Sequence, residues 1–91
     1  MEFEWDAAKS DQTLRERGFG FEYAACVFDG ATIETVDDRR AYGEVRVRAI
    51  GQVDKNVLVV VYTDRNHARR IVSARIANRK ERQLWQSFAS R

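Results

Sequence analysis

The sequence predicts an α+β domain in which two N-terminal helices precede an antiparallel sheet of about four strands, and a C-terminal helix ends the chain. Apolar residues recur at helical spacing before residue 30 and again after Asn78. Between residues 32 and 75 they alternate with polar residues or form short unbroken runs, as strands do. The loops there are short, which makes the strands antiparallel neighbours. With 91 residues, we expect one domain over residues 1–91.

Two helices are expected in the N-terminal third. The first begins after Asp6, a good N-cap residue, and ends near Gly18, which can adopt a left-handed conformation. Apolar residues spaced by three, four and seven predict a second short helix over residues 21–28. Cys26 lies inside it and is expected to be a small core residue. Because it is the only cysteine, it can form neither an internal disulfide nor a cysteine metal cluster.

Four segments are expected to form the strands: residues 32–36, 44–50, 56–62 and 70–75. Strict alternation over residues 44–50 places Arg46 and Arg48 on one face. Residues 56–62 are apolar on both faces, which is typical of a central strand. In the last strand, alternation places Arg70 and Arg75 on opposite faces. From Asn78 onward a closing helix is expected, and the helices should cover one face of the sheet and leave the other partly open.

The net charge of +2 conceals a strong asymmetry. Residues 1–44 carry five Lys/Arg against eleven Asp/Glu, a net charge of −6, whereas residues 65–91 carry eight against one, a net charge of +7. The basic part suits a phosphate-binding surface, although a solvated helix face explains it equally well. The N-terminus lacks the features of a signal peptide and no apolar run could cross a membrane, so we expect a cytoplasmic protein without a membrane partner.

Few motifs with recognisable chemistry are present. The sequence holds one histidine and contains no zinc-binding or glycine-rich phosphate-loop motif. The paired carboxylates Asp37 and Asp38 could bind Mg²⁺, but an acidic polar turn explains them better. We therefore expect neither a metal nor another cofactor.

Arginines on or beside the predicted strands are the remaining candidates: Arg46, Arg48, Arg65, Arg70 and Arg75. Guanidinium groups bind phosphate through paired hydrogen bonds and do not titrate. For any one of these arginines, an ion pair with an acidic residue or a contribution to solubility is a better explanation than phosphate binding. Those roles explain a cluster of four or five arginines near one sheet face less well. RNA cleavage fits such a cluster, because RNA supplies its own 2′-OH nucleophile and arginines stabilise the charge that develops on phosphate. Arg79 and Lys80 would extend the basic surface.

A proton acceptor is also required for this chemistry. The candidates are His67, Glu44 and Tyr62. His67 has the most suitable pKa range, although it lies in a predicted loop. Tyr62 is better explained as a core or sheet-face residue.

The sequence also resembles the BrnT toxin family along nearly its whole length. The resemblance is carried mainly by Phe3-Glu-Trp-Asp6, Lys9, Gly18, Val27-Phe-Asp29, Gly43-Glu44, Arg46, Ile50-Gly51, Arg65, Arg70-Ile-Val-Ser-Ala-Arg75 and Glu81-Arg82. It implies a RelE-like ribonuclease fold, RNA cleavage that blocks translation, and an RNA-binding role to which we assign Lys9. It also implies a BrnA-like antitoxin partner, through which alone the toxin reaches operator DNA. The antitoxin is expected to cover the arginine-bearing face or an adjacent groove.

Three positions depart from the family pattern: Thr13, Arg17 and Trp85. They bear on whether activity is retained or partner specificity has changed. The alternative hypothesis is therefore a non-catalytic module that binds an antitoxin or nucleic acid. A purely structural interaction domain, with its arginines engaged in ion pairs, is a third possibility.

Overall fold

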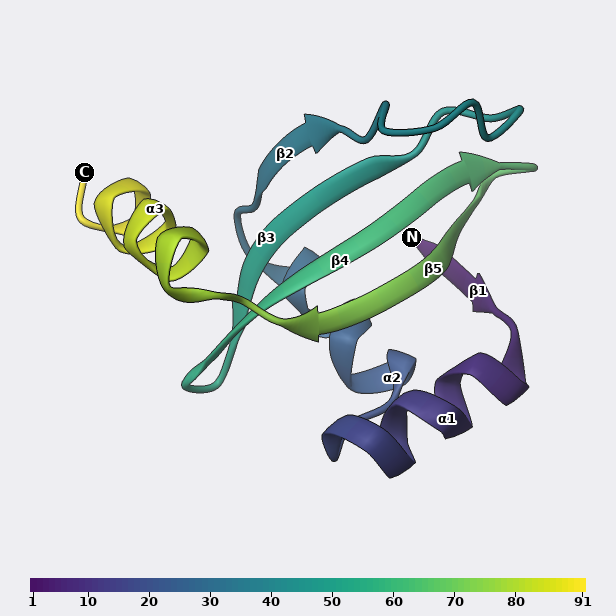
Figure 1. The fold of residues 1–91 in the computed structure, drawn as a ribbon, viewed down its shortest axis with the longest axis horizontal. Helices are drawn as coiled ribbons and strands as arrows, with labels where there is room; N and C mark the ends of the chain where they lie inside the picture. The colour runs from purple at the N-terminus through teal and green to yellow at the C-terminus, as the bar shows by residue number, and fades with distance from the viewer.

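A computed structural model describes residues 1–91 as a five-stranded mixed sheet with helices on both faces (Figure 1). The elements are β1 (Glu2–Trp5), α1 (Ala7–Arg17), α2 (Phe21–Ala24), the 3-10 helix η1 (Ala25–Asp29), β2 (Ile33–Val36), β3 (Val47–Val53), β4 (Asn56–Arg65), β5 (Ala68–Ile76) and α3 (Arg79–Ala89). The strand order is β1-β5-β4-β3-β2, with the apolar β4 at the centre as expected. The α+β class is confirmed.

The expectation of about four antiparallel strands is wrong in one respect. β1 is a fifth strand that pairs with β5 in parallel, with Glu2 opposite Ala68 and Trp5 opposite Ile71. The chain between them contains the rest of the sheet, two α-helices and the 3-10 helix η1, so this parallel connection is long. β3 also begins at Val47, later than expected, so Arg46 precedes the strand.

Helix α1 has the expected ends. The Asp6 carboxylate accepts hydrogen bonds from the amides of Ala8 and Lys9, at 2.9 and 3.2 Å, and Gly18 ends the helix with a φ of 86°. The second expected helix becomes α2 followed by the tighter η1. The prediction that Cys26 is buried is wrong, because Cys26 points outward from η1 while its neighbours Ala25 and Val27 are buried.

Helices α1, α2 and η1 lie on one face of the sheet, which we call the helix-covered face. Phe21 and Val27 pack there against Leu58, Val60 and Ile71 of the two central strands. η1 approaches β3 so closely that a Cβ atom at position 51 would lie 2.7 Å from the Cβ of Val27. Glycine is therefore required at position 51.

The opposite face, which we call the open face, is covered only at one end by α3. Trp85 packs there with Ile50, Val59 and Ala77, and its indole N–H donates to the Gln52 side chain at 2.8 Å. Asn78 and Glu81 form a reciprocal capping box that starts α3. The expectation that all helices cover one face is thus wrong, and Figure 1 shows α3 on the other side of the molecule from α1 and α2. No helix in the structure has the length and apolar character needed to cross a bilayer.

A β-bulge changes the alternation of β5. Val61 pairs with Ser73, but the next residue of β4, Tyr62, pairs with Ile71, so Val72 is an extra residue. Arg70 consequently faces the same side as Ser73 and Arg75, and the prediction that Arg70 and Arg75 lie on opposite faces is wrong. The β4–β5 hairpin closes through Asn66 and His67, which both have positive φ, at 52° and 64°.

Candidate nucleic-acid interface

The open face gathers arginines from three strands. Arg48 of β3 is opposite Val61 of β4, and Val61 is opposite Ser73 of β5. Directly paired residues project to the same side, so Arg48 and Ser73 share this face, with Arg75 two residues further along β5. We call Arg48, Arg65, Arg70 and Arg75 the arginine face.

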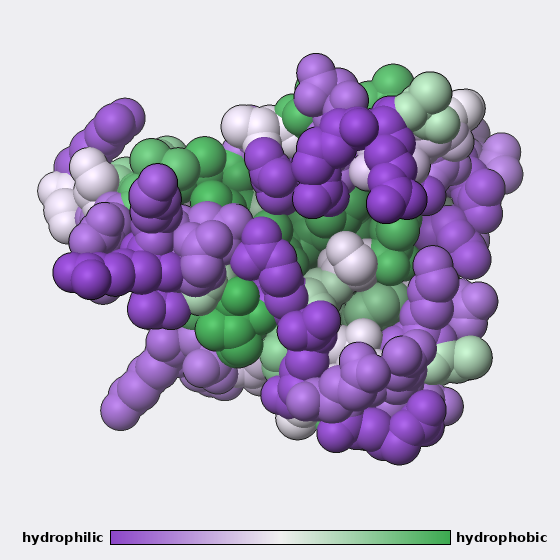
Figure 2. All heavy atoms as spheres, in the orientation of Figure 1, coloured by the Kyte–Doolittle hydropathy of each residue, from purple (hydrophilic) through white to green (hydrophobic).

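The centre of the molecule in this orientation is less polar than its rim. In Figure 2, hydrophobic residues are visible in the middle of the view, where the central strands lie, and hydrophilic residues surround them. The open-face residues Val59, Val61 and Thr63 of β4 are all buried. On this face, long cationic side chains therefore lie beside the short, buried side chains of β4.

Most of these arginines already have acidic partners. Arg75 makes two parallel hydrogen bonds to Glu81, at 2.7 and 2.8 Å, which lower the pKa of that carboxyl below its usual range. Glu4 lies 3.4 Å from Arg65 and 4.0 Å from Arg70. These two looser contacts are solvent-accessible, and such pairs contribute about 0–1 kcal/mol. A phosphate group can therefore compete with Glu4 at little cost.

Arg48 differs from its neighbours. It is half-buried and makes no ion pair and no side-chain hydrogen bond. Arg48 is opposite Thr35, two residues before Asp37, and its charge contributes to the lowered pKa values of Asp37 and Glu81. A half-buried guanidinium group without a partner has donors available for an anion.

Arg46 and Glu44 lie at the edge of this face, where they form an ion pair at 3.2 Å. The Arg46 guanidinium also stacks on the Tyr42 ring, 3.9 Å from its centre. Glu44 lines a shallow pocket together with Thr63 and Arg65. Of the three proposed proton acceptors, Glu44 is the carboxylate adjoining the arginine face.

The other two proposed proton acceptors are placed less favourably. Tyr62 faces the helix-covered side, where its hydroxyl donates to Glu34 at 2.6 Å, and burial raises its pKa well above the usual value. His67 is exposed at the tip of the β4–β5 hairpin, close to Arg65 but about 25 Å along β5 from Arg75. The structure thus brings His67 near one end of the arginine face only.

The remaining predicted RNA-binding residues fall on two sides. Arg79 and Lys80 are exposed in the first turn of α3, next to the open face. Lys9 is exposed on α1, which packs with α2 on the helix-covered side, so it does not adjoin the arginine face. Of the positions that depart from the family pattern, Trp85 is a core residue, which explains why an aromatic side chain is needed there.

The acidic pair in the loop after β2 has a structural partner. Both oxygens of the Asp37 carboxylate accept hydrogen bonds from Arg39, at 2.7 and 2.8 Å. This arrangement agrees with an acidic turn rather than a Mg²⁺ site. Arg39 itself was not among the predicted site residues, because the sequence gives no strand pattern around it.

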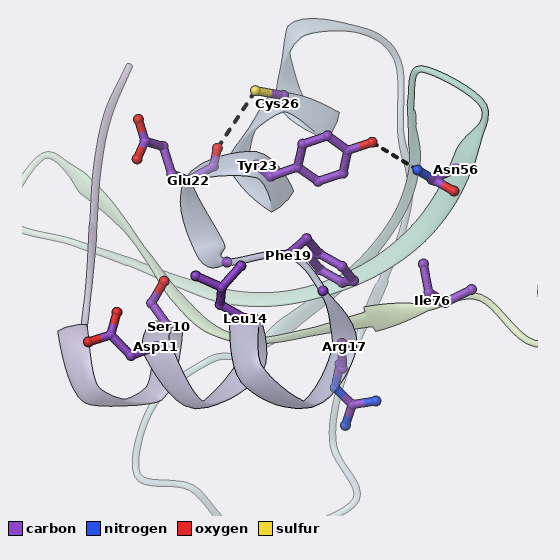
Figure 3. Close-up of a pocket in the computed structure, with 12 residues that line it drawn as sticks. Ser10, Asp11, Leu14, Arg17, Phe19, Glu22, Tyr23, Cys26, Asn56 and Ile76 are labelled. Carbon is purple, nitrogen blue, oxygen red and sulfur yellow. Dashed lines mark hydrogen bonds between the residues drawn. The ribbon is translucent and has the colours of Figure 1, made fainter.

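A second hollow lies on the helix-covered side. It has a volume of about 820 Å³ and is lined by Leu14, Phe19, Tyr23 and Ile76, with Arg17 at its margin (Figure 3). Leu14 and Ile76 are exposed apolar residues. Arg17, one of the positions that depart from the family pattern, therefore lies at this hollow and not on the arginine face.

Comparison with known families identifies the chain. No curated protein matches it. A family model described as the ribonuclease toxin BrnT of type II toxin–antitoxin systems matches residues 5–81, which include α1, all strands after β1, and the start of α3. The arginine-bearing sheet face lies entirely within the matched residues. The chain belongs to the BrnT family of ribonuclease toxins of type II toxin–antitoxin systems.

Proposed function

We propose that this protein is an endoribonuclease of RelE-like architecture that binds RNA on the arginine face and inhibits translation by cleaving it. The observation that carries the proposal is the gathering of Arg48, Arg70 and Arg75 on the open face, with Arg48 free of any acidic partner. Family membership supports an RNA substrate and an antitoxin partner. A cytoplasmic location follows from that substrate and partner.

In the proposed reaction, the 2′-OH of the RNA gives its proton to a general base and attacks the adjacent phosphorus. The bond to the 5′-oxygen breaks, which leaves a 2′,3′-cyclic phosphate and a 5′-hydroxyl that takes its proton from water. Arg48 and Arg70, which lies at the Glu44 end of the open face, hold this phosphate and stabilise the charge that develops on its oxygens. Arg65 and Arg70 are released from Glu4 when RNA binds, Arg75 binds a neighbouring phosphate, and Arg46 steadies Glu44. Because guanidinium groups supply the positive charge, the proposed reaction uses no metal ion, and chelation should leave its rate unchanged.

The proton acceptor is proposed to be Glu44, with His67 as the competing candidate. Glu44 adjoins Arg65 in the same shallow pocket, whereas His67 lies at the hairpin tip. Glu44→Gln should lower the cleavage rate about 10²–10⁴-fold, the range for loss of a general base. If His67→Ala has that effect and Glu44→Gln does not, the assignment must be reversed.

The test of the function itself is expression of the chain in bacteria with and without its antitoxin. Growth arrest that the antitoxin relieves, with RNA cleavage by purified protein, would support the proposal. Arg48→Ala should strongly reduce both growth arrest and RNA cleavage while the protein stays folded, because Arg48 has no ion pair to lose. Full toxicity of Arg48→Ala, Arg46→Ala and Arg75→Ala would contradict it.

A non-catalytic binding module is the second candidate. The ion pairs of Arg46, Arg65, Arg70 and Arg75 favour it. So does the engagement of Asp37 and Glu81, the carboxylates nearest Arg48, by paired hydrogen bonds from Arg39 and Arg75. A purified protein that binds RNA without shortening it would decide for this alternative.

The antitoxin is proposed to be BrnA-like and to cover the arginine face with an acidic segment, because opposite charges favour such a contact. Operator DNA would then be bound only through the antitoxin. Competition between antitoxin and RNA for the purified protein tests this: a complex that binds RNA as well as the free protein does would contradict it.

A further inference from the structure

The loop after β2 holds an arginine beside the arginine face. The Asp37 side chain is only 1% exposed, and its backbone amide donates to the Arg46 carbonyl at 2.8 Å, which extends the β2–β3 ladder beyond β2. Its carboxylate binds Arg39 through Nε and one terminal nitrogen. This contact lowers the pKa of Asp37 to about 2, so the carboxylate stays charged at physiological pH.

The contact with Asp37 fixes the Arg39 guanidinium group but leaves some of its N–H donors without a partner. A guanidinium group carries five N–H donors, and Asp37 engages the Nε–H and one N–H of Nη2. The Arg39 side chain remains 65% exposed. It therefore presents its other donors to solvent from a nearly fixed position, an arrangement suited to a charged oxygen ligand.

Two further arginines lie on the same face as Asp37. Arg48 is opposite Thr35 of β2, and Asp37 follows Thr35 by two residues on the same face. Arg75, which binds Glu81, lies across β4 from Arg48, because Arg48 is opposite Val61 and Val61 is opposite Ser73, two residues before Arg75. Together the three arginines and the carboxylates of Asp37 and Glu81 carry one positive charge in excess.

We propose that Arg39, Arg48 and Arg75 together form a single phosphate-binding site for RNA, in which Asp37 and Glu81 are positioning residues that hold Arg39 and Arg75 in place. The proposal rests on the proposed function, because it takes RNA as the ligand of the open face. It adds Arg39 and Asp37 to that site. The Glu4–Arg65–Arg70 group adjoins this site, because Arg70 is opposite Thr63, two residues or about 7 Å along β4 from the partner of Arg48.

The proposal can be tested with a fluorescein-labelled single-stranded RNA in which every 2′-OH is methylated, so that binding is measured without cleavage. Anisotropy titrations at several salt concentrations give the Kd and its salt dependence. Arg39→Ala should weaken binding about tenfold and reduce the salt slope by about one contact. Arg15→Ala removes the same charge from exposed α1, on the other side of the sheet, and should bind as the wild type does.

Asp37 requires a test that separates positioning from folding. If Asp37 acts through Arg39, Asp37→Asn should weaken RNA binding in the wild type but add little in the Arg39→Ala background. Thermal unfolding confirms that each variant is folded at the titration temperature. Should Arg39→Ala fail to fold, Arg39→Gln keeps a hydrogen-bond donor near Asp37 and tests the same loss of charge.

The outcomes distinguish this inference from the proposed function. Wild-type Kd and salt slope in the Arg39 variant would overturn the phosphate site, whether or not the wild type cleaves RNA. Loss of affinity in Arg39→Ala, combined with no cleavage of unmodified RNA by the wild type, would sustain the site and refute the ribonuclease. Equal losses for Arg39→Ala and Arg15→Ala would reduce the effect to net charge and overturn the proposal.

Discussion

The two faces of the sheet are built from the same strands yet do different things. On the helix-covered face, Leu58 and Val60 of β4 pack under α2 and η1. On the open face, Val59 and Val61 of the same strand are just as buried, but arginines from the flanking strands stand beside them. The apolar centre of β4 thus contributes buried side chains to both faces. The two faces differ in what the flanking elements add: helices on one face and arginines of β3 and β5 on the other.

Two adjacent arginines of β5 show the difference most directly. Arg69 projects to the helix-covered side, where it bonds to Asp64 at 2.8 and 3.0 Å and lies 3.9 Å from the centre of the Tyr62 ring. Arg70 projects to the open face, where Glu4 is 4.0 Å away. Arg69 is engaged by Asp64 and Tyr62 and stabilises the fold, whereas Arg70 has only a distant acidic partner, and we propose that it binds RNA.

The largest expected effect concerns the open face. Arg48→Ala should lower the rate of RNA cleavage about 10²–10³-fold, the loss typical of one group that stabilises transition-state charge. Its thermal stability should stay close to that of the wild type, because no ion pair is removed. Single-turnover cleavage and calorimetry measure the two quantities. A stability loss as large as the catalytic loss would mean that Arg48 is a structural residue.

The next largest effect concerns the helix-covered face. Leu58 is fully buried, so Leu58→Ala should reduce the free energy of unfolding by about 2–5 kcal/mol. Ser73→Ala, on the exposed open face, is the control and should change stability by less than about 0.5 kcal/mol. Urea unfolding measures both. The affinity of folded Leu58→Ala for RNA should equal that of the wild type, and a weaker affinity would show that the faces are coupled.

Smaller effects are expected at Arg69 and Arg70, where one substitution should change stability and the other should change RNA binding. Arg69→Ala should cost about 1–2 kcal/mol of stability through the lost ring contact and leave RNA binding unchanged. Arg70→Ala should leave stability nearly unchanged and reduce the salt slope of RNA binding by about one. Unfolding and anisotropy titrations on both variants make the comparison. Similar behaviour of the two variants would contradict the bulge-dependent assignment of faces.

The smallest effect is the pH dependence that Asp37 adds. Hydrogen bonds from Arg39 lower its pKa from 3.8 to about 2, so the unfolded state takes up a proton first as the pH falls. The stabilisation is complete above pH 3.8 and is lost as the pH falls through about 2. Asp37→Asn should make the stability curve flatter over that interval in unfolding measurements. An unchanged slope would show that Asp37 and Arg39 do not interact in solution.

Much of the local structure could be predicted from the sequence, because its signals lie within a few residues of one another. Asp6 and Gly18 bound α1, and the unbroken apolar run of residues 56–62 identifies the central strand. Of the arginines proposed to bind RNA, Arg48, Arg70 and Arg75 could also be named from the predicted strands, whereas Arg39 could not, because it lies in a loop. Which of them share a face could not, because the extra residue Val72 reverses the alternation only through pairing with β4.

The sequence by itself therefore determined the fold class, the helix ends, the central strand and the family. Tertiary structure decided the parallel pairing of β1, the placement of α3 on the open face, the exposure of Cys26 and the isolation of Arg48 from acidic partners. The physical reason is the range of the interactions. Caps and periodicity act between residues three or four apart, whereas strand pairing, bulges and ion pairs across the sheet join residues that only the folded chain brings together.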